Sequence, residues 1–113
     1  MTTEAVTVFT GNYNDMLAAV PENKLIVLDF FATWCGPCRR LGQQLPKLVQ
    51  DFPNVQFYKV DIDANAALTD YYSVRSVPHI KFFRKESDKL NELDSITGFD
   101  LNKLKSKLEQ YKN

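Results

Sequence analysis

Residues 25–38 read LIVLDFFATWCGPC, an apolar run followed by two cysteines that are separated by two residues. Cys35 and Cys38 are the only cysteines of the 113-residue chain. The apolar run at 25–32 predicts a buried strand, and the segment at 39–52 predicts a helix. A Cys-x-x-Cys motif at this junction places one thiol at a helix N-terminus, where unpaired N–H groups and the helix dipole stabilise a thiolate. Because a thiolate attacks disulfides, the motif indicates dithiol–disulfide exchange.

Length and composition indicate one small globular domain, spanning residues 1–113. The 14 basic and 14 acidic residues give zero formal net charge, which predicts no nucleic-acid or anionic-membrane partner. The N-terminal segment lacks the pattern of a secretory or transit leader, and no apolar run is long enough to span a membrane. We therefore expect a cytoplasmic monomer, in which a Cys-x-x-Cys is more often catalytic or metal-binding than structural.

Hydrophobic periodicity predicts the element order β-α-β-α-β-α-β-β-α. We expect strands at residues 6–10, 25–32, 55–60, 80–83 and 90–96, and helices at 14–20, 39–52, 63–72 and from 100 onward. Alternating strands and helices pair in parallel and the closing hairpin is antiparallel, so the fold class is α/β, a central mixed sheet with helices on both faces. The hairpin segment 84–89 contains no glycine, which predicts a long loop.

The chain resembles the thioredoxin family in its element order, its length and the motif DFFATWCGPCR at residues 29–39. The resemblance covers nearly the whole chain and implies the thioredoxin fold. It also implies a protein-disulfide reductase, in which Cys35 attacks the client disulfide and Cys38 resolves the mixed disulfide, forming a redox-active Cys35–Cys38 disulfide. The residues alone leave open a structural thiol pair or half of a zinc site. The zinc alternative lacks ligands, since His79 is the only histidine.

The resemblance also implies the partners of the reaction. No bound cofactor is expected, and no Gly-rich dinucleotide motif is present, so electrons would come from NADPH through a separate thioredoxin reductase. Expected clients are peroxiredoxins, ribonucleotide reductase and methionine sulfoxide reductases, in a role in electron transport and cell redox homeostasis. Two alternatives remain: a thiol oxidase or isomerase of the same fold, and a binding module whose dithiol is incidental.

Asp29 lies inside the apolar strand, where burial of a charged carboxylate is costly, so its pKa is expected to rise. The resemblance implies that Asp29 is the buried aspartate that helps Cys38 lose its proton through water, and that Lys59 is the lysine beside it. In the alternative interpretation Asp29 faces solvent at a strand end and Lys59 is simply exposed.

Val77 and Pro78 precede a predicted strand. Sequence alone favours a trans peptide bond here, whereas the resemblance implies a cis bond beside the disulfide, with neighbouring backbone binding the client. Gly98 matches the glycine that lets the client approach. A strand-edge proline and a plain turn glycine are the alternatives.

Three residues around the cysteines complete the motif. Trp34 is expected to cover one side of the site, although a lone aromatic could belong to the core. Gly36 allows a tight turn beside the sulfurs. Pro37 costs little, because the first helical turn has no partner for the missing N–H.

His79 departs from the family pattern, which usually has threonine after the proline. We hypothesise that its imidazolium stabilises the Cys35 thiolate below about pH 6.5, the alternative being a polar residue at the groove rim. Arg39 and Arg40 follow the motif where the family often has one basic residue. They could lower thiol pKa values, steer acidic partners or form a solvated face.

Overall fold

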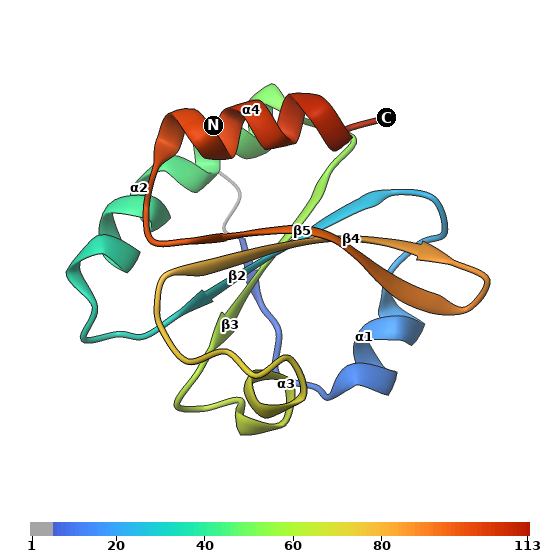
Figure 1. Ribbon diagram of the computed structural model, residues 1–113, viewed down its shortest axis with the longest axis horizontal. Helices are drawn as coiled ribbons and strands as arrows, with labels where there is room; N and C mark the ends of the chain where they lie inside the picture. Colours follow the sequence, from blue (N-terminus) through green and yellow to red (C-terminus); the bar gives the residue numbers. More distant parts are fainter. Residues whose placement is uncertain (1–5) are drawn as a thin grey trace.

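A computed structural model describes residues 6–113 of the chain (Figure 1). Its strands are β1 (Thr7–Val8), β2 (Leu25–Phe31), β3 (Gln56–Asp61), β4 (His79–Glu86) and β5 (Lys89–Thr97). Its helices are α1 (Tyr13–Ala19), α2 (Gly36–Asp51), α3 (Ala66–Tyr71) and α4 (Leu101–Tyr111). The predicted order β-α-β-α-β-α-β-β-α is therefore confirmed.

The strands form one sheet in the order β1-β3-β2-β4-β5. β3 is parallel to both β1 and β2, while β4 is antiparallel to β2 and to β5. This is the predicted mixed sheet. β2 lies at its centre, and the chain leaves the end of β2 directly into the turn before α2. The central strand therefore delivers the Cys-x-x-Cys motif to one end of the sheet.

Helices cover both faces of the sheet, with α2 and α4 on one side and α1 and α3 on the other (Figure 1). The side chains of β2 alternate between these layers, as those of a strand must. Leu25 and Val27 pack with residues of α2 and α4, whereas Ile26 and Leu28 pack with residues of α1 and α3. The same alternation directs Asp29 toward the layer of α2.

Polar side chains determine where the helices begin. Asn12 and Asp15 form a capping box at the start of α1, which satisfies N–H groups that have no partner within the helix. The Asn65 side chain caps α3, so this helix begins three residues later than the predicted boundary at 63. Asp100 accepts a hydrogen bond from the backbone N–H of Lys103 and caps α4, which begins close to the predicted boundary at 100.

The turn between β4 and β5 is short, and the prediction of a long loop is wrong. β4 continues to Glu86 and β5 starts at Lys89, which leaves only Ser87 and Asp88 between them. These two residues have φ values of 54° and 60°. Two-residue hairpin turns with positive φ match the twist of the strands, and aspartate adopts this conformation more readily than most residues. The turn therefore forms without glycine.

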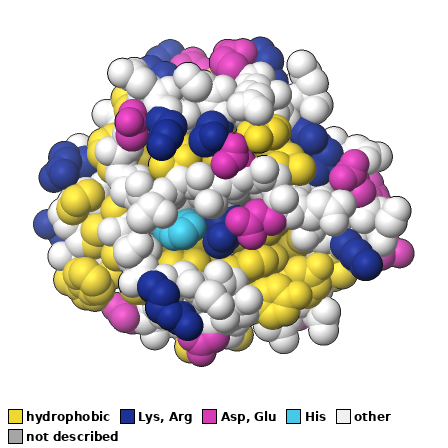
Figure 2. All heavy atoms as spheres, in the orientation of Figure 1, with side chains coloured by type: hydrophobic (Ala, Val, Ile, Leu, Met, Phe, Trp, Pro, Cys, Tyr) yellow, Lys and Arg dark blue, Asp and Glu magenta, His cyan; other side chains and the backbone are white. Residues whose placement is uncertain are grey.

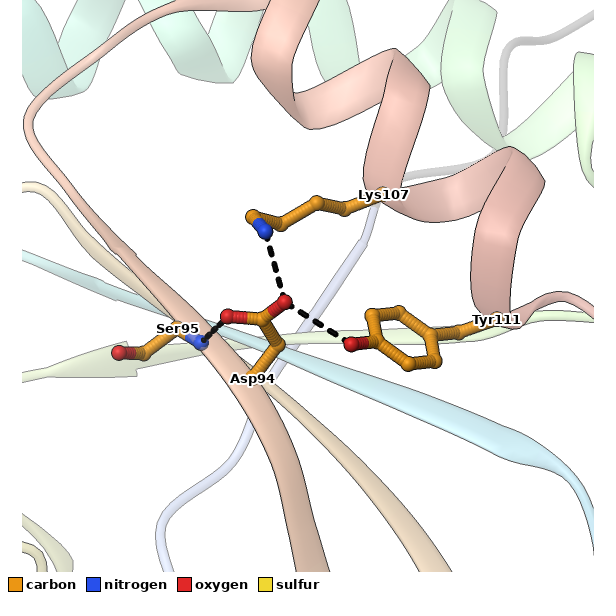
Figure 3. Close-up of polar contacts among 4 residues, drawn as sticks. All are labelled: Asp94, Ser95, Lys107 and Tyr111. Carbon is orange, nitrogen blue, oxygen red and sulfur yellow. Dashed lines mark hydrogen bonds and ion pairs between the residues drawn. The ribbon is translucent and has the colours of Figure 1, made fainter.

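Asp94 of β5 fastens α4 to the edge of the sheet (Figure 3). One carboxylate oxygen accepts hydrogen bonds from Lys107 Nζ at 2.6 Å and Tyr111 Oη at 3.0 Å, both on α4. The other accepts from the backbone N–H of Ser95 at 2.8 Å. The hydrogen bond from Lys107, reinforced by those from Ser95 and Tyr111, lowers the pKa of Asp94 below its ordinary 3.8 although burial acts in the opposite direction. A β-bulge just before Asp94 leaves Leu93 without a partner on β4.

Candidate redox site

Cys35 and Cys38 form a disulfide at the start of α2, with their Cα atoms 5.2 Å apart. Cys35 is the N-cap of the helix, and the first turn contains Gly36 and Pro37. The backbone N–H of Cys38 donates a hydrogen bond to Cys35 Sγ over 3.2 Å. A sulfur in this position lies at the positive end of the helix dipole. The arrangement can therefore stabilise negative charge on Cys35 when the disulfide opens.

Both cysteines are buried in this disulfide. Cys35 is 6% exposed and Cys38 is 4% exposed. The cause is an apolar cover, since Ala32 is buried with the two cysteines and other side chains pack against them, namely Phe31, Ile62 and Val77. Little of either cysteine is therefore exposed to a client.

Asp29 is buried on the same side of the sheet as α2, with 2% of its surface exposed. Within residues 6–113 neither carboxylate oxygen has a hydrogen-bond partner. Burial raises the pKa of Asp29 from 3.8 to about 7, while the positive charge of Lys59 acts in the opposite direction. The predicted rise in pKa is confirmed, and the solvent-facing alternative is wrong. Asp29 can therefore exchange a proton near neutral pH.

Lys59 is the residue paired with Asp29 in the parallel register of β2 and β3. Its Nζ lies 4.4 Å from the centre of the Phe31 ring, a cation–π contact. Among the ion pairs found between residues 6 and 113, none joins Lys59 to Asp29. Lys59 thus influences the carboxyl through its charge without a direct salt bridge.

Trp34 is 67% exposed, so the core alternative for this residue is wrong. Its Nε1 donates a hydrogen bond to Asp63 Oδ2 over 2.9 Å. Asp61 fixes the turn that presents Asp63, because Asp61 Oδ1 accepts hydrogen bonds from the backbone N–H groups of Asp63 and Ala64. Neither aspartate stands out in the sequence as a site residue. The sequence gives no local signal that would pair Asp63 with an indole 29 residues away.

Val77, Pro78 and Gly98 meet beside the disulfide. The Val77–Pro78 peptide bond is cis, as the resemblance implied. The backbone N–H of Gly98 donates to the Pro78 carbonyl over 2.8 Å, and Val77 packs against the two cysteines. Gly98 has a φ of 87°, and nothing lies within 4 Å of the place where a Cβ would be. Open backbone therefore borders the disulfide on the side of β4 and β5.

His79 lies on the face of the sheet opposite α2. Figure 2 shows the histidine (cyan) next to basic (blue) and acidic (magenta) side chains. His79 alternates with Ile80, which packs with residues of α2, and its own charged neighbours are Lys81 and Glu92. These two form an ion pair of 2.8 Å. Burial, followed by the charge of Lys81, lowers the pKa of His79 below 6.5, while Glu92 acts in the opposite direction. The structure gives no support to an imidazolium at the Cys35 sulfur.

Two further findings concern residues 6–113. No group of three or more histidine, cysteine and acidic side chains in this range is placed to hold a metal ion. No helix there is both long and apolar enough to cross a membrane.

Comparison with known proteins supplies the remaining observation. The thioredoxin family model matches residues 4–110. A thioredoxin from Malassezia sympodialis is 32% identical over 104 residues, covering 89% of this chain and 94% of the relative. Thioredoxin-2 from Pyricularia oryzae is 37% identical over 82 residues, covering 73% of this chain but only 47% of that protein's length. The solved structure of Trichomonas vaginalis thioredoxin superposes with a TM-score of 0.88 at 38% identity, covering 96% and 98% of the two chains.

Proposed function

The chain belongs to the thioredoxin family of disulfide oxidoreductases, and we propose that it is a protein-disulfide reductase. One observation carries the assignment of roles. Cys35 caps α2 and its sulfur already accepts the backbone N–H of Cys38. Because the helix N-terminus favours negative charge at this sulfur, Cys35 is the thiolate that attacks the client.

The reaction proceeds through two exchanges. The Cys35 thiolate attacks one sulfur of the client disulfide, forming a mixed disulfide and releasing the other client sulfur as a thiolate. The Cys38 thiolate then attacks Cys35 Sγ, which closes the Cys35–Cys38 disulfide and releases the second client sulfur. The client gains two electrons and the chain loses two. The disulfide present in the structure is the product of this second step.

Asp29 supports the second step by accepting the proton of Cys38. A base works best when its pKa is near the operating pH, and the pKa of Asp29 is about 7. Its side chain is directed toward the layer of α2, which carries Cys38. We expect Asp29→Asn to slow release of the client from the mixed disulfide by about tenfold or more near pH 7. Rapid acid quenching and mass measurement of the mixed disulfide test this.

Family membership supports a choice of partners. Thioredoxins act on disulfide clients such as peroxiredoxins, and we extend this to ribonucleotide reductase and methionine sulfoxide reductases. Backbone around Val77, Pro78 and Gly98 would hold the client in extended form. NADPH and a separate thioredoxin reductase would restore the dithiol, in the cytoplasm.

The first experiment is the reduction potential of the Cys35–Cys38 couple, measured by equilibration with a glutathione or dithiol buffer. We expect a value clearly more reducing than the roughly −180 mV of protein disulfide isomerase. A potential at or above that level would reassign the protein as an oxidase or isomerase.

Replacement of Cys35 by serine separates catalysis from simple binding. We expect the variant to lose all reduction of a protein disulfide by NADPH and a thioredoxin reductase. Retained activity would refute the catalytic role of Cys35. Loss of partner binding at a fixed redox state would favour a binding module.

A further inference from the structure

A groove runs beside the first half of α2, on the side of β3, and has a volume of about 480 Å³. It begins at the redox site, since Cys38 and Ala32 form part of its lining. The other lining residues include Phe31, Arg39, Gln43 and Lys59. A smaller hollow of about 210 Å³ shares Lys59 with the groove and continues it along the helix past Leu45 and Pro46. The groove is thus continuous with the disulfide.

The lining combines two cations with an apolar floor. Arg39 and Lys59 are basic, and no acidic residue occurs among the described residues that line either hollow. On β2 and β3, Asp29 is buried, and Asp61 accepts hydrogen bonds from the backbone N–H groups of Asp63 and Ala64. Complementary charge at such a surface selects an anionic partner.

Arg39 is held in place at the mouth of the groove. One of its guanidinium nitrogens donates a hydrogen bond to the backbone carbonyl of Thr33 over 3.0 Å. Thr33 immediately precedes Trp34, so the cation lies beside the segment that borders the disulfide. A guanidinium fixed in this way still has donors left for a carboxylate. It can bind one without losing much conformational freedom.

We propose that this groove binds an acidic segment of the client, next in sequence to the client's reactive cysteine. The inference rests on the proposed function, and it defines a class of preferred clients. A client held at Pro78 and Gly98 crosses the disulfide, and its chain then continues over Arg39 toward Lys59. Formal net charge is zero, so attraction of acidic clients depends on local cations and not on the charge of the whole molecule.

The test uses a series of disulfide-bonded peptides that share one neutral core. Each carries a flank of three glutamates or of three glutamines, placed either before or after the core. The pre-reduced protein is mixed with each peptide, and the second-order rate of a single turnover is measured. We expect at least one acidic flank to raise this rate roughly threefold at about 0.01 M salt and to lose its advantage near 1 M, where charges are screened beyond about 3 Å.

Arg39 and Arg40 provide a matched pair of variants. Their guanidinium nitrogens lie 3.9 and 3.8 Å from the position that a Cβ on Gly36 would occupy, so both are equally close to the motif. Only Arg39 lines the groove. We expect Arg39→Gln to remove most of the preference for acidic flanks and Arg40→Gln to preserve it. Equal losses in the two variants would indicate a general charge effect and overturn the proposal.

Gln43 and Gln44 provide a second pair, in which charge is added. Gln43 lines the groove and Gln44 does not. Gln43→Glu should reverse the preference to favour the neutral flank, whereas Gln44→Glu should leave the wild-type preference intact. Unfolding of both variants by urea checks that each is folded.

Other outcomes are equally decisive. If the neutral peptide is reduced and no acidic flank changes its rate, the groove inference fails while the reductase function stands. If no peptide is reduced, the proposed function itself fails. A dimer in sedimentation that is abolished by Arg39→Gln, without any preference for acidic peptides, would assign the groove to a second copy of the chain and overturn the proposal.

Discussion

Two aspartates on the same side of the sheet have opposite environments. Asp29, in the central strand, is buried without a hydrogen-bond partner among the described residues, and its pKa rises to about 7. Asp94, in the edge strand, accepts three hydrogen bonds, and its pKa falls below 3.8 (Figure 3). The difference shows that burial without hydrogen-bond donors favours the protonated carboxyl, whereas donors around a less buried carboxyl keep it charged. The protein destabilises one carboxylate on the side of the sheet that α2 covers and uses the other to fasten a helix.

The largest expected effect is at Asp29. Because its pKa is raised, the folded protein retains a proton that the unfolded chain releases, so stability falls as pH rises from about 4 to about 7. The shift from 3.8 to about 7 corresponds to about 4 kcal/mol. Asp29→Asn should remove this loss of stability, so the variant should be more stable than the wild type above pH 7. Urea denaturation at several pH values tests this.

Asp70, an exposed residue of α3, supplies the control for this measurement. Asp70→Asn should show the wild-type dependence of stability on pH. If the advantage of Asp29→Asn were the same at pH 5 and pH 8, the buried carboxyl would not be the group that titrates.

Asp94 should behave in the opposite way. Asp94→Ala removes the acceptor of three hydrogen bonds, and we expect the free energy of unfolding at pH 7 to fall by about 1 to 3 kcal/mol. Since the pKa of Asp94 is lowered, its contribution is present above about pH 4 and is lost as pH falls through the folded-state pKa. Denaturation at about pH 7 and about pH 2 should therefore show a smaller difference at acid pH.

Replacement of Lys107 measures how much of the contribution of Asp94 to stability comes from their ion pair. Its ammonium and the Asp94 carboxylate are partly buried, so we expect Lys107→Met to cost about 0.5 to 1 kcal/mol. Lys105, exposed on the same helix, is the control. A double-mutant cycle with Asp94→Ala isolates the pair, and zero coupling would contradict the contact.

His79 should have the smallest effect on the redox site. We expect His79→Thr to leave the titration of the Cys35 thiolate, followed by its ultraviolet absorbance, unchanged. Because the pKa of His79 is lowered, its neutral form stabilises the fold above about pH 6.5 and this contribution is lost as pH falls. His79→Thr should therefore change the free energy of unfolding only at acid pH, below about 6.5. A shifted thiolate titration would restore the role of this residue at the sulfur.

Much of the scaffold could be predicted because it depends on short-range patterns. The apolar run of β2, the spacing of leucines in α2 and the cap at Asp100 each report a local preference, and together they specify the order and the sheet. The burial of Asp29 could also be predicted, because this carboxylate lies inside an apolar run that is expected to be buried.

The features that the sequence did not reveal have a different origin. Ser87 and Asp88 turn the chain by adopting positive φ, which composition alone did not reveal. His79 follows Pro78 in sequence, but strand alternation turns its side chain away from α2. The hydrogen bond of Trp34 to Asp63 depends on how distant segments meet, and no local pattern encodes that distance.

The edges of the sheet have a consequence for the behaviour of the protein at high concentration. β1 has only two residues, and β5 combines a bulge at Leu93 with charges at Lys89 and Glu92. A short edge and a bulged, charged edge are both poor templates for a strand from another molecule. Concentrated solutions should therefore resist the growth of fibrils, even though the central strands are among the most apolar segments of the chain.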